Sequence, residues 1–135
     1  MRLTDRNIDQ LAPVAEDVFD HPLVPVRLAA YVAIRENIFV VAIRDNLTVG
    51  HIRGTIIRQP DRNDDAYVDN FGVSPEHQRR GIGRALYEAF AKHAGNLGAD
   101  NIWLATETDN DGAIAFYRAL GLHQQIVAYF STDKT

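Results

Sequence analysis

HQRRGIGRAL, residues 77–86, places two glycines one residue apart directly before a helical pattern. Glycine lets a loop bend sharply and lets its backbone approach a ligand with no Cβ in the way. The start of a helix also offers unpaired amides and a partial positive charge. Three arginines surround the same place: Arg79, Arg80 and Arg84. The stretch therefore predicts either a diphosphate cradle around Gly81 and Gly83 or an ordinary tight turn from a strand into a helix.

Two familiar phosphate-binding loops do not fit this spacing. A Walker loop has four residues between its glycines and ends in Gly-Lys-Ser/Thr, whereas this loop has one residue between them and an arginine next. The dinucleotide fingerprint needs a third glycine three residues after Gly83, and the sequence has Leu86 there.

Length and composition indicate one soluble globular domain spanning residues 1–135, with 46% hydrophobic and 24% charged residues. The absence of cysteine excludes disulfides, thiolate metal sites and a cysteine nucleophile. The histidines at positions 51, 77, 93 and 123 show no metal-ligand spacing, so we expect no metal. A net charge of -4 without a Lys/Arg block argues against nucleic acid. The sequence has no secretory signal and no apolar run of about 18 residues, so we expect a cytoplasmic protein without a membrane partner.

Hydrophobic periodicity predicts a mixed α/β fold. Helical spacing is found over residues 7–19, 24–37, 82–97 and 109–120, although Pro13 argues for a break or a late start in the first of these. In the second, we expect Val26, Ala29, Ala30, Ala33 and Ile34 to form one face. Strands are expected over residues 37–45, 47–59, 66–73, 101–107 and 124–130. The first two strands form an antiparallel hairpin, and the strand–helix–strand segment 67–106 implies a parallel pair.

The wider context resembles a known superfamily. DNFGVSPEHQRRGIGRAL, residues 69–86, resembles the acetyl-coenzyme A signature of the GNAT N-acetyltransferases, Gln/Arg-x-x-Gly-x-Gly/Ala. Its six positions here are Gln78, Arg79, Arg80, Gly81, Ile82 and Gly83. TETDNDGAIAFYRALG, residues 106–121, is similar to a second helix motif of that superfamily, with Asn110, Ala113, Phe116, Tyr117 and Gly121 in place. The resemblance implies a central mixed sheet of about six or seven strands flanked by about four helices.

The resemblance also implies a binding mode for acetyl-CoA as the acyl donor. The diphosphate would lie on the loop amides of residues 79–84. The pantetheine arm would pair with the preceding strand at Phe71, Gly72 and Val73, where two parallel strands splay apart. Gly72 fits a bulge or a close ligand approach, and a plain strand irregularity is the alternative. Asn110 and Tyr117 complete the cofactor-binding set.

The implied reaction is direct transfer of acetyl from the thioester to an amine. Tyr117 matches the tyrosine often assigned as the acid for the leaving thiolate, with a core tyrosine as the alternative. Asp69, which we expect on one strand face with Tyr67, Phe71 and Val73 unless a bulge rephases it, is one candidate base. Glu107 is the other, and each carboxylate could instead be merely solvated.

Residues 67–135 resemble the type I aminoglycoside 3-N-acetyltransferases, which implies a small cationic acceptor. Four acids would then line an anionic cleft: Glu107, Asp109, Asp111 and Asp133. The sequence departs from those enzymes at Asn70, where an aspartate is expected. A peptide or protein amine, an amino acid or a polyamine is the alternative acceptor, and a non-catalytic acetyl-CoA-binding module is the alternative function. The apolar segment IVAYF, residues 126–130, makes a homodimer plausible.

Overall fold

The computed structural model describes residues 1–133. The chain divides into two compact units, one ending at Leu104 and one beginning at Ala105. The first unit contains a 3₁₀ turn at Ile8–Gln10, α1 (Pro25–Ala33), β1 (Asn37–Arg44), β2 (Leu47–Ile57), β3 (Asp64–Val73), a 3₁₀ turn at Pro75–His77, α2 (Ile82–Asn96) and β4 (Ala99–Trp103). The second unit contains α3 (Asp111–Ala119). Within the described residues, no helix combines the length and apolarity needed to cross a membrane.

The four strands form one mixed sheet in the order β1-β2-β3-β4. β1 and β2 form the expected antiparallel hairpin, and β2 and β3 are also antiparallel. β3 and β4 are parallel, joined through α2, as the strand–helix–strand segment predicts. The described residues thus contain fewer strands than the resemblance implied, but the mixed α/β architecture is confirmed.

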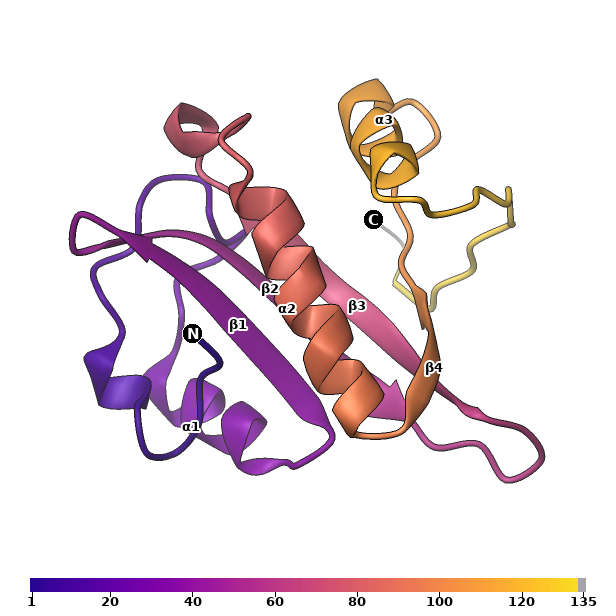
Figure 1. Ribbon diagram of the computed structural model, residues 1–135, viewed down its shortest axis with the longest axis horizontal. Coiled ribbons are helices and arrows are strands. Elements are labelled where there is room, and N and C mark those ends of the chain that lie inside the picture. Colours follow the sequence, from indigo (N-terminus) through magenta and orange to yellow (C-terminus); the bar gives the residue numbers. More distant parts are fainter. Residues whose placement is uncertain (134–135) are drawn as a thin grey trace. The chain divides into compact units, whose positions relative to one another are not determined.

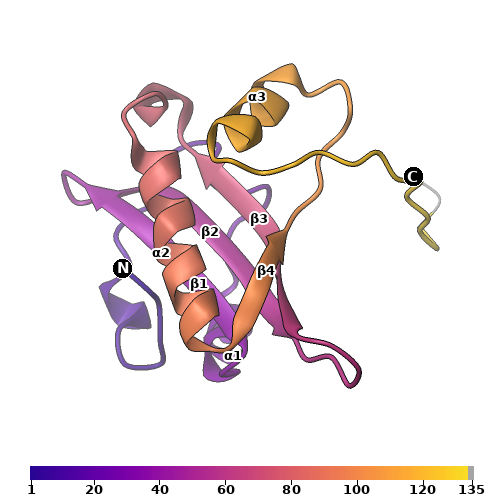
Figure 2. The ribbon, with the colours of Figure 1, turned by 45° about the vertical axis from the view of Figure 1, so that its right-hand side comes forward.

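The sheet is covered on both faces, α2 lying on one and α1 with the N-terminal segment on the other (Figures 1 and 2). The α2 face is the larger core. Its helical contribution is Leu86, Phe90 and Ala94, packed on buried strand residues such as Ile52 and Val68. The opposite face is a smaller cluster formed by Leu3, Phe39 and Val41, with partly buried apolar side chains packed on it.

The predicted helix over residues 7–19 is wrong, because only the 3₁₀ turn Ile8–Gln10 forms there. Pro13 cannot donate a helical hydrogen bond, and the segment instead bonds to β2 as an extended chain. The Thr48 amide donates to the Pro13 carbonyl at 2.7 Å, and the Ala15 amide donates to the Thr48 carbonyl at 2.9 Å. The Thr48 hydroxyl also donates to the Ala12 carbonyl at 2.9 Å. These bonds join positions more than thirty residues apart, so local periodicity could not reveal them.

The second predicted helix exists, but the face predicted for it is wrong. Val26 and Ile34 are 75% and 53% exposed, whereas Leu28, Tyr31 and Val32 pack on the sheet. The segment is apolar all round, so the spacing of its residues allowed more than one buried stripe. The Tyr31 hydroxyl donates to the Gly54 carbonyl at 3.0 Å and thereby fixes the observed face.

The predicted strand over residues 124–130 is also wrong. The segment has no regular structure, and its apolar side chains are exposed, with Ile126, Val127, Tyr129 and Phe130 between 75% and 88% accessible. A strand needs a hydrogen-bonded neighbour, and the described part of the second unit contains no strand to pair with. The homodimer expected from this segment stays a prediction.

Gly54 lies where the β3 backbone and Phe90 of α2 leave no room for a side chain, and we predict that Gly54→Ala destabilises the fold. An added Cβ would collide with the Tyr67 carbonyl and lie 2.9 Å from Cζ of Phe90. We expect a loss of about 2–4 kcal/mol in the free energy of unfolding, measured by urea denaturation. Gly95→Ala in α2 is the matched control, because a Cβ there meets nothing within 4 Å. Equal denaturation midpoints for the two variants would contradict the prediction.

Candidate functional site

The candidate site is built on the end of β3. A bulge in this strand decides which of its side chains point to which face of the sheet. Arg53 pairs with Asn70 and Gly54 pairs with Val68, so Asp69 is the extra residue. Asp69 Oδ2 lies 3.7 Å from Arg53 Nε, and the Asn70 amide donates to Asp20 Oδ2 at 3.0 Å. The side chains of Asp69 and Asn70 therefore lie on the face of the sheet opposite α2.

Phe71 and Val73, in contrast, pack against the core under α2. The prediction that Asp69 shares a face with Phe71 and Val73 is thus wrong, for the reason that the bulge inserts one residue and reverses the alternation. The bulge lies at Asp69 and not at Gly72. The group that approaches Gly72 closely is a carbonyl of the chain itself, and an approach by a ligand stays a prediction. A Cβ on Gly72 would lie 2.7 Å from the Val18 carbonyl oxygen.

β3 extends well past its parallel partner. The register with β4 ends at Tyr67↔Trp103, where the two rings stack with centroids 4.4 Å apart. β4 stops at Trp103, while β3 continues to Val73. The splaying of two parallel strands next to Phe71–Val73 stays a prediction, since the structure shows only that β4 ends before β3 does. An extended amide-bearing arm could add to β3 along this length.

The loop from β3 into α2 is fixed by hydrogen bonds at its base. The buried Ser74 donates its amide to the Val49 carbonyl at 2.8 Å, and the Gln78 side chain donates to the Val73 carbonyl at 3.1 Å. Arg79 and Gly81 both have left-handed backbones, with φ of 62° and 80°. That conformation is easy for glycine and costs an arginine about 1 kcal/mol, so the loop holds a shape that its residues would not otherwise favour.

Gly81 is the N-cap of α2, and no side chain caps this helix. Its first turn carries no acidic residue, whereas the arginines at positions 79, 80 and 84 are exposed around it. Ile82 packs against the core and anchors the first turn, and Gly83 follows it as the second helical residue. An uncapped helix start with a left-handed glycine before it and cationic side chains around it is chemically suited to an anion such as a diphosphate.

The remaining predicted site residues belong to the second unit. Asn110 caps α3, since its side-chain oxygen accepts the Ala113 amide at 3.1 Å. Tyr117 is half-buried in α3, and burial raises the pKa of its hydroxyl, which therefore stays protonated at neutral pH. Glu107 has an exposed side chain, and its carbonyl accepts the Asn110 amide at 3.1 Å. Gly121 has the left-handed backbone expected after the helix, with φ of 91°.

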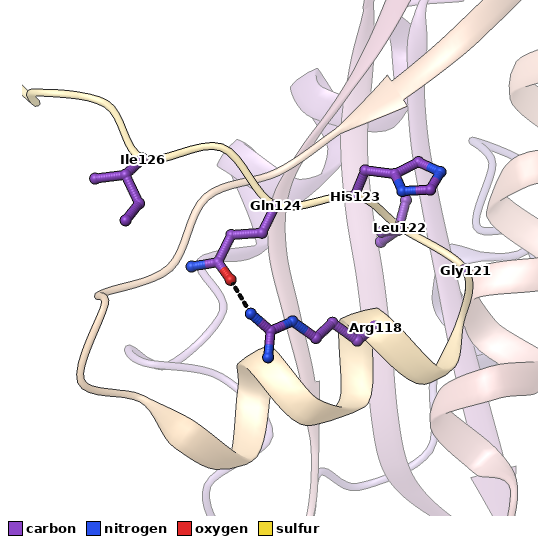
Figure 3. A pocket seen from close by; sticks show the side chains of 6 residues that line it. All are labelled: Arg118, Gly121, Leu122, His123, Gln124 and Ile126. Atoms are coloured by element: carbon purple, nitrogen blue, oxygen red, sulfur yellow. Dashed lines mark hydrogen bonds between the residues drawn. The ribbon is translucent and has the colours of Figure 1, made fainter.

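A hollow of about 730 Å³ lies in the second unit just after α3 (Figure 3). Its lining is Arg118, Gly121, Leu122, His123, Gln124 and Ile126. Arg118 and Gln124 point toward one another and are joined by a short hydrogen bond. The sequence did not predict this feature, and the bond holds the chain after α3 against the helix. Among residues 1–133, no group of three His, Cys, Asp or Glu side chains is placed to hold a metal ion.

His51 of β2 lies beside the end of β3, although the sequence pattern did not mark it as a site residue. It is fully buried on β2 opposite Gly72, with its ring centroid 4.2 Å from that of Phe19 and 5.7 Å from that of Phe39. Neither ring nitrogen makes a well-formed hydrogen bond to the described residues. Burial, reinforced by the positive charge of Arg53, lowers the pKa of His51 to about 3, so the ring is neutral under ordinary conditions. The signal available in the sequence was its alternation with Arg53 and Thr55 along one face of the hairpin.

This buried histidine gives the protein a predictable response to acid. The folded-state pKa lies below the unfolded value of about 6.5, so the unfolded chain takes up a proton first. Stability linked to His51 is complete above about pH 6.5 and falls by about 1.4 kcal/mol per pH unit as the pH drops toward 3. Urea denaturation between pH 7.5 and 4.5 measures the slope, and His51→Leu should make it shallower. Identical slopes for the two proteins would show that His51 is not the responsible group.

The family assignment comes from comparison with known proteins. The Acetyltransferase (GNAT) family model matches residues 6–122. The [ribosomal protein bS18]-alanine N-acetyltransferase of Escherichia coli K12 is 36% identical over 73 residues, which are 52% of this chain and 49% of that protein. The matched segment thus spans about half the length of this curated relative.

Two solved structures share the fold at low identity. One is an aminoglycoside acetyltransferase from an uncultured soil metagenomic sample, in complex with sisomicin. It matches with a TM-score of 0.79 and 20% identity, and the match covers 99% of this chain and 95% of that chain. A ribosomal-protein-alanine N-acetyltransferase from Brucella melitensis has a TM-score of 0.74 and 17% identity, covering 98% of each chain. Both likenesses concern the fold alone.

Proposed function

Because the chain belongs to the acetyltransferase (GNAT) family, we propose that it is an acetyl-CoA-dependent N-acetyltransferase that acts on a primary amine. The observation that carries the proposal is the start of α2. Left-handed Gly81 precedes a helix with no side-chain cap, exposed arginines surround it, and β3 extends beside it past its partner β4. Acetyl-CoA has a diphosphate that could bind at the start of α2, and it has an amide-bearing arm that could pair with the end of β3.

The reaction is a direct transfer. The deprotonated amine nitrogen attacks the thioester carbonyl carbon and forms a C–N bond. The tetrahedral intermediate then collapses, the C–S bond breaks, and the thiolate receives a proton. Tyr117 is our candidate for that proton donor, because it matches the tyrosine of the superfamily's helix motif and its hydroxyl carries a proton at neutral pH. The acceptor ammonium loses one proton before the attack, and the bonded nitrogen loses a second one afterwards. Both leave through a carboxylate or water, with Asp69 and Glu107 as the candidate carboxylates, and one of the two protons restores the Tyr117 hydroxyl.

Two acceptor classes have separate support. A small cationic acceptor is favoured by the acids around α3, Glu107, Asp109 and Asp111. A peptide α-amine is favoured by the 36% identity to a ribosomal-protein-alanine enzyme. Solved structures with this fold include acetyltransferases of both kinds, so the fold does not distinguish the two acceptor classes.

We predict that Gly83→Val weakens acetyl-CoA binding by at least about tenfold, because a branched side chain at the second helical residue crowds the diphosphate. Gly95→Val is the matched control, since it changes the same helix at a position where an added Cβ meets nothing within 4 Å. Titration calorimetry on both folded variants measures the effect. Unchanged affinity in Gly83→Val would remove the cradle from the proposal.

We further predict that at least one class of primary amine accelerates thiol release from acetyl-CoA, and that Tyr117→Phe loses most of that acceleration while binding acetyl-CoA normally. The phenylalanine keeps the ring and removes the hydroxyl group that would donate the proton. The measurement is a thiol assay with aminoglycosides, short peptides, amino acids and polyamines at millimolar concentration. Tight acetyl-CoA binding without turnover of any amine would instead identify a non-catalytic binding module. An unchanged rate in Tyr117→Phe would remove Tyr117 from the mechanism.

A further inference from the structure

Residues 18–20 cross over the end of β3 at the place where the proposed thioester arm would pair. The Val18 carbonyl lies so close to Gly72 that a Cβ there would be 2.7 Å from its oxygen. Phe19 stacks on the buried His51 ring at a centroid distance of 4.2 Å. Asp20 accepts a hydrogen bond from Asn70 at 3.0 Å. Three successive residues of the N-terminal segment are thus each held against β2 or β3.

Asp20 is held in place without being neutralised. Its bonding partner, Asn70, is an uncharged amide, and within the described residues its carboxylate forms no ion pair. Arg53, the nearby cation on β2, is paired with Asp69 at 3.7 Å and lies over the Phe39 ring at 5.8 Å. The lowered pKa of His51 keeps that ring uncharged, so it does not offset the carboxylate either. A fixed and exposed carboxylate without an ion-pair partner, next to the part of β3 where the thioester arm is proposed to pair, is suited to hold an ammonium group.

The surroundings of Asp20 indicate what kind of ammonium compound it would hold. A surface hollow of about 400 Å³ opens beside it, within the first unit. Its lining is mostly apolar, and Asp20 and His21 are the polar residues among those that line it. The apolar members are Leu11, Val14, Ala15, Phe19, Pro22 and Leu23. A polycation would gain one charge contact here and would leave its other charges against apolar walls. An amine with an apolar group next to it would satisfy both the carboxylate and the hollow.

We propose that Asp20 binds the acceptor amine and that the adjoining hollow receives an apolar group attached to it, so that the preferred acceptor is a monocationic amine with an apolar body, such as the α-amine of a peptide with an apolar first residue. This inference rests on the proposed acetyltransferase function and gives it a substrate class. Asp20 is assigned to binding and orienting the amine, and the carboxylate or water that takes its proton is a separate question.

The test uses the full chain and two substitutions that remove one charge each. Asp20→Asn keeps an oxygen that can accept the Asn70 hydrogen bond, so the segment stays anchored while its charge is lost. Asp17→Asn is the matched control, since Asp17 is an exposed acid in the same segment, and asparagine tolerates its left-handed backbone. The acceptors are the amides of Leu-Gly-Gly and Gly-Gly-Gly, together with an aminoglycoside.

We expect the wild-type protein to acetylate the Leu peptide with a kcat/KM at least about tenfold above that for the Gly peptide or the aminoglycoside. Asp20→Asn should raise KM for the Leu peptide by about tenfold or more, with kcat and the acetyl-CoA dissociation constant little changed. Asp17→Asn should match the wild type. Val14→Phe, which fills the hollow from an exposed position, should erase the preference for the Leu peptide and spare the Gly peptide.

The outcomes separate the inference from the function on which it rests. If no amine is acetylated by the wild type, the proposed function fails. If amines are acetylated but Asp20→Asn behaves like Asp17→Asn, or lowers kcat alone, Asp20 is not the amine-binding group and the inference is overturned. A preference for the aminoglycoside over both peptides, or an undiminished Leu preference in Val14→Phe, would overturn the assignment of the hollow.

Discussion

The arrangement of the candidate site depends on the register between β2 and β3, and within it on the one-residue bulge at Asp69. Without the bulge, Phe71 and Val73 would share a face with Asp69. With it, the two apolar side chains enter the core beneath α2, and Asp69 and Asn70 turn to the other face. One inserted residue thus lets the same strand end pack under α2 on one side and present a polar surface on the other.

The polar surface in turn holds the N-terminal segment. Asn70 bonds to Asp20, Gly72 leaves room for the Val18 carbonyl, and His51 provides the ring on which Phe19 stacks. Burying a histidine without well-formed hydrogen bonds is costly, since desolvation lowers its pKa to about 3. This free-energy cost is tolerated when the residues packed around the buried ring hold it in place. Here the packing of Phe19 on His51 also holds the N-terminal segment over β3.

The parts that the sequence predicted well are those built from neighbouring residues. α2, the β1–β2 hairpin, the parallel β3–β4 pair and the cap after α3 follow from local spacing and glycine placement. The failures are non-local. Residues 7–19 have a helical pattern but bond to Thr48, which lies more than thirty residues away. Residues 124–130 have a strand pattern, and a strand depends on a partner that no pattern within the segment supplies.

The same division explains why the donor was easier to infer from the sequence than the acceptor. The proposed diphosphate cradle is one continuous stretch, Gln78–Arg84, so its glycines and arginines show their spacing directly. The surface proposed for the acceptor depends on Asp20 of the N-terminal segment, which is held by Asn70 of β3 and by packing of that segment on the buried His51 of β2. No two of these residues lie within a single motif, and a tertiary register brings them together. Acceptor preference in such a chain therefore has to be inferred from contacts between segments, because a short sequence motif does not contain them.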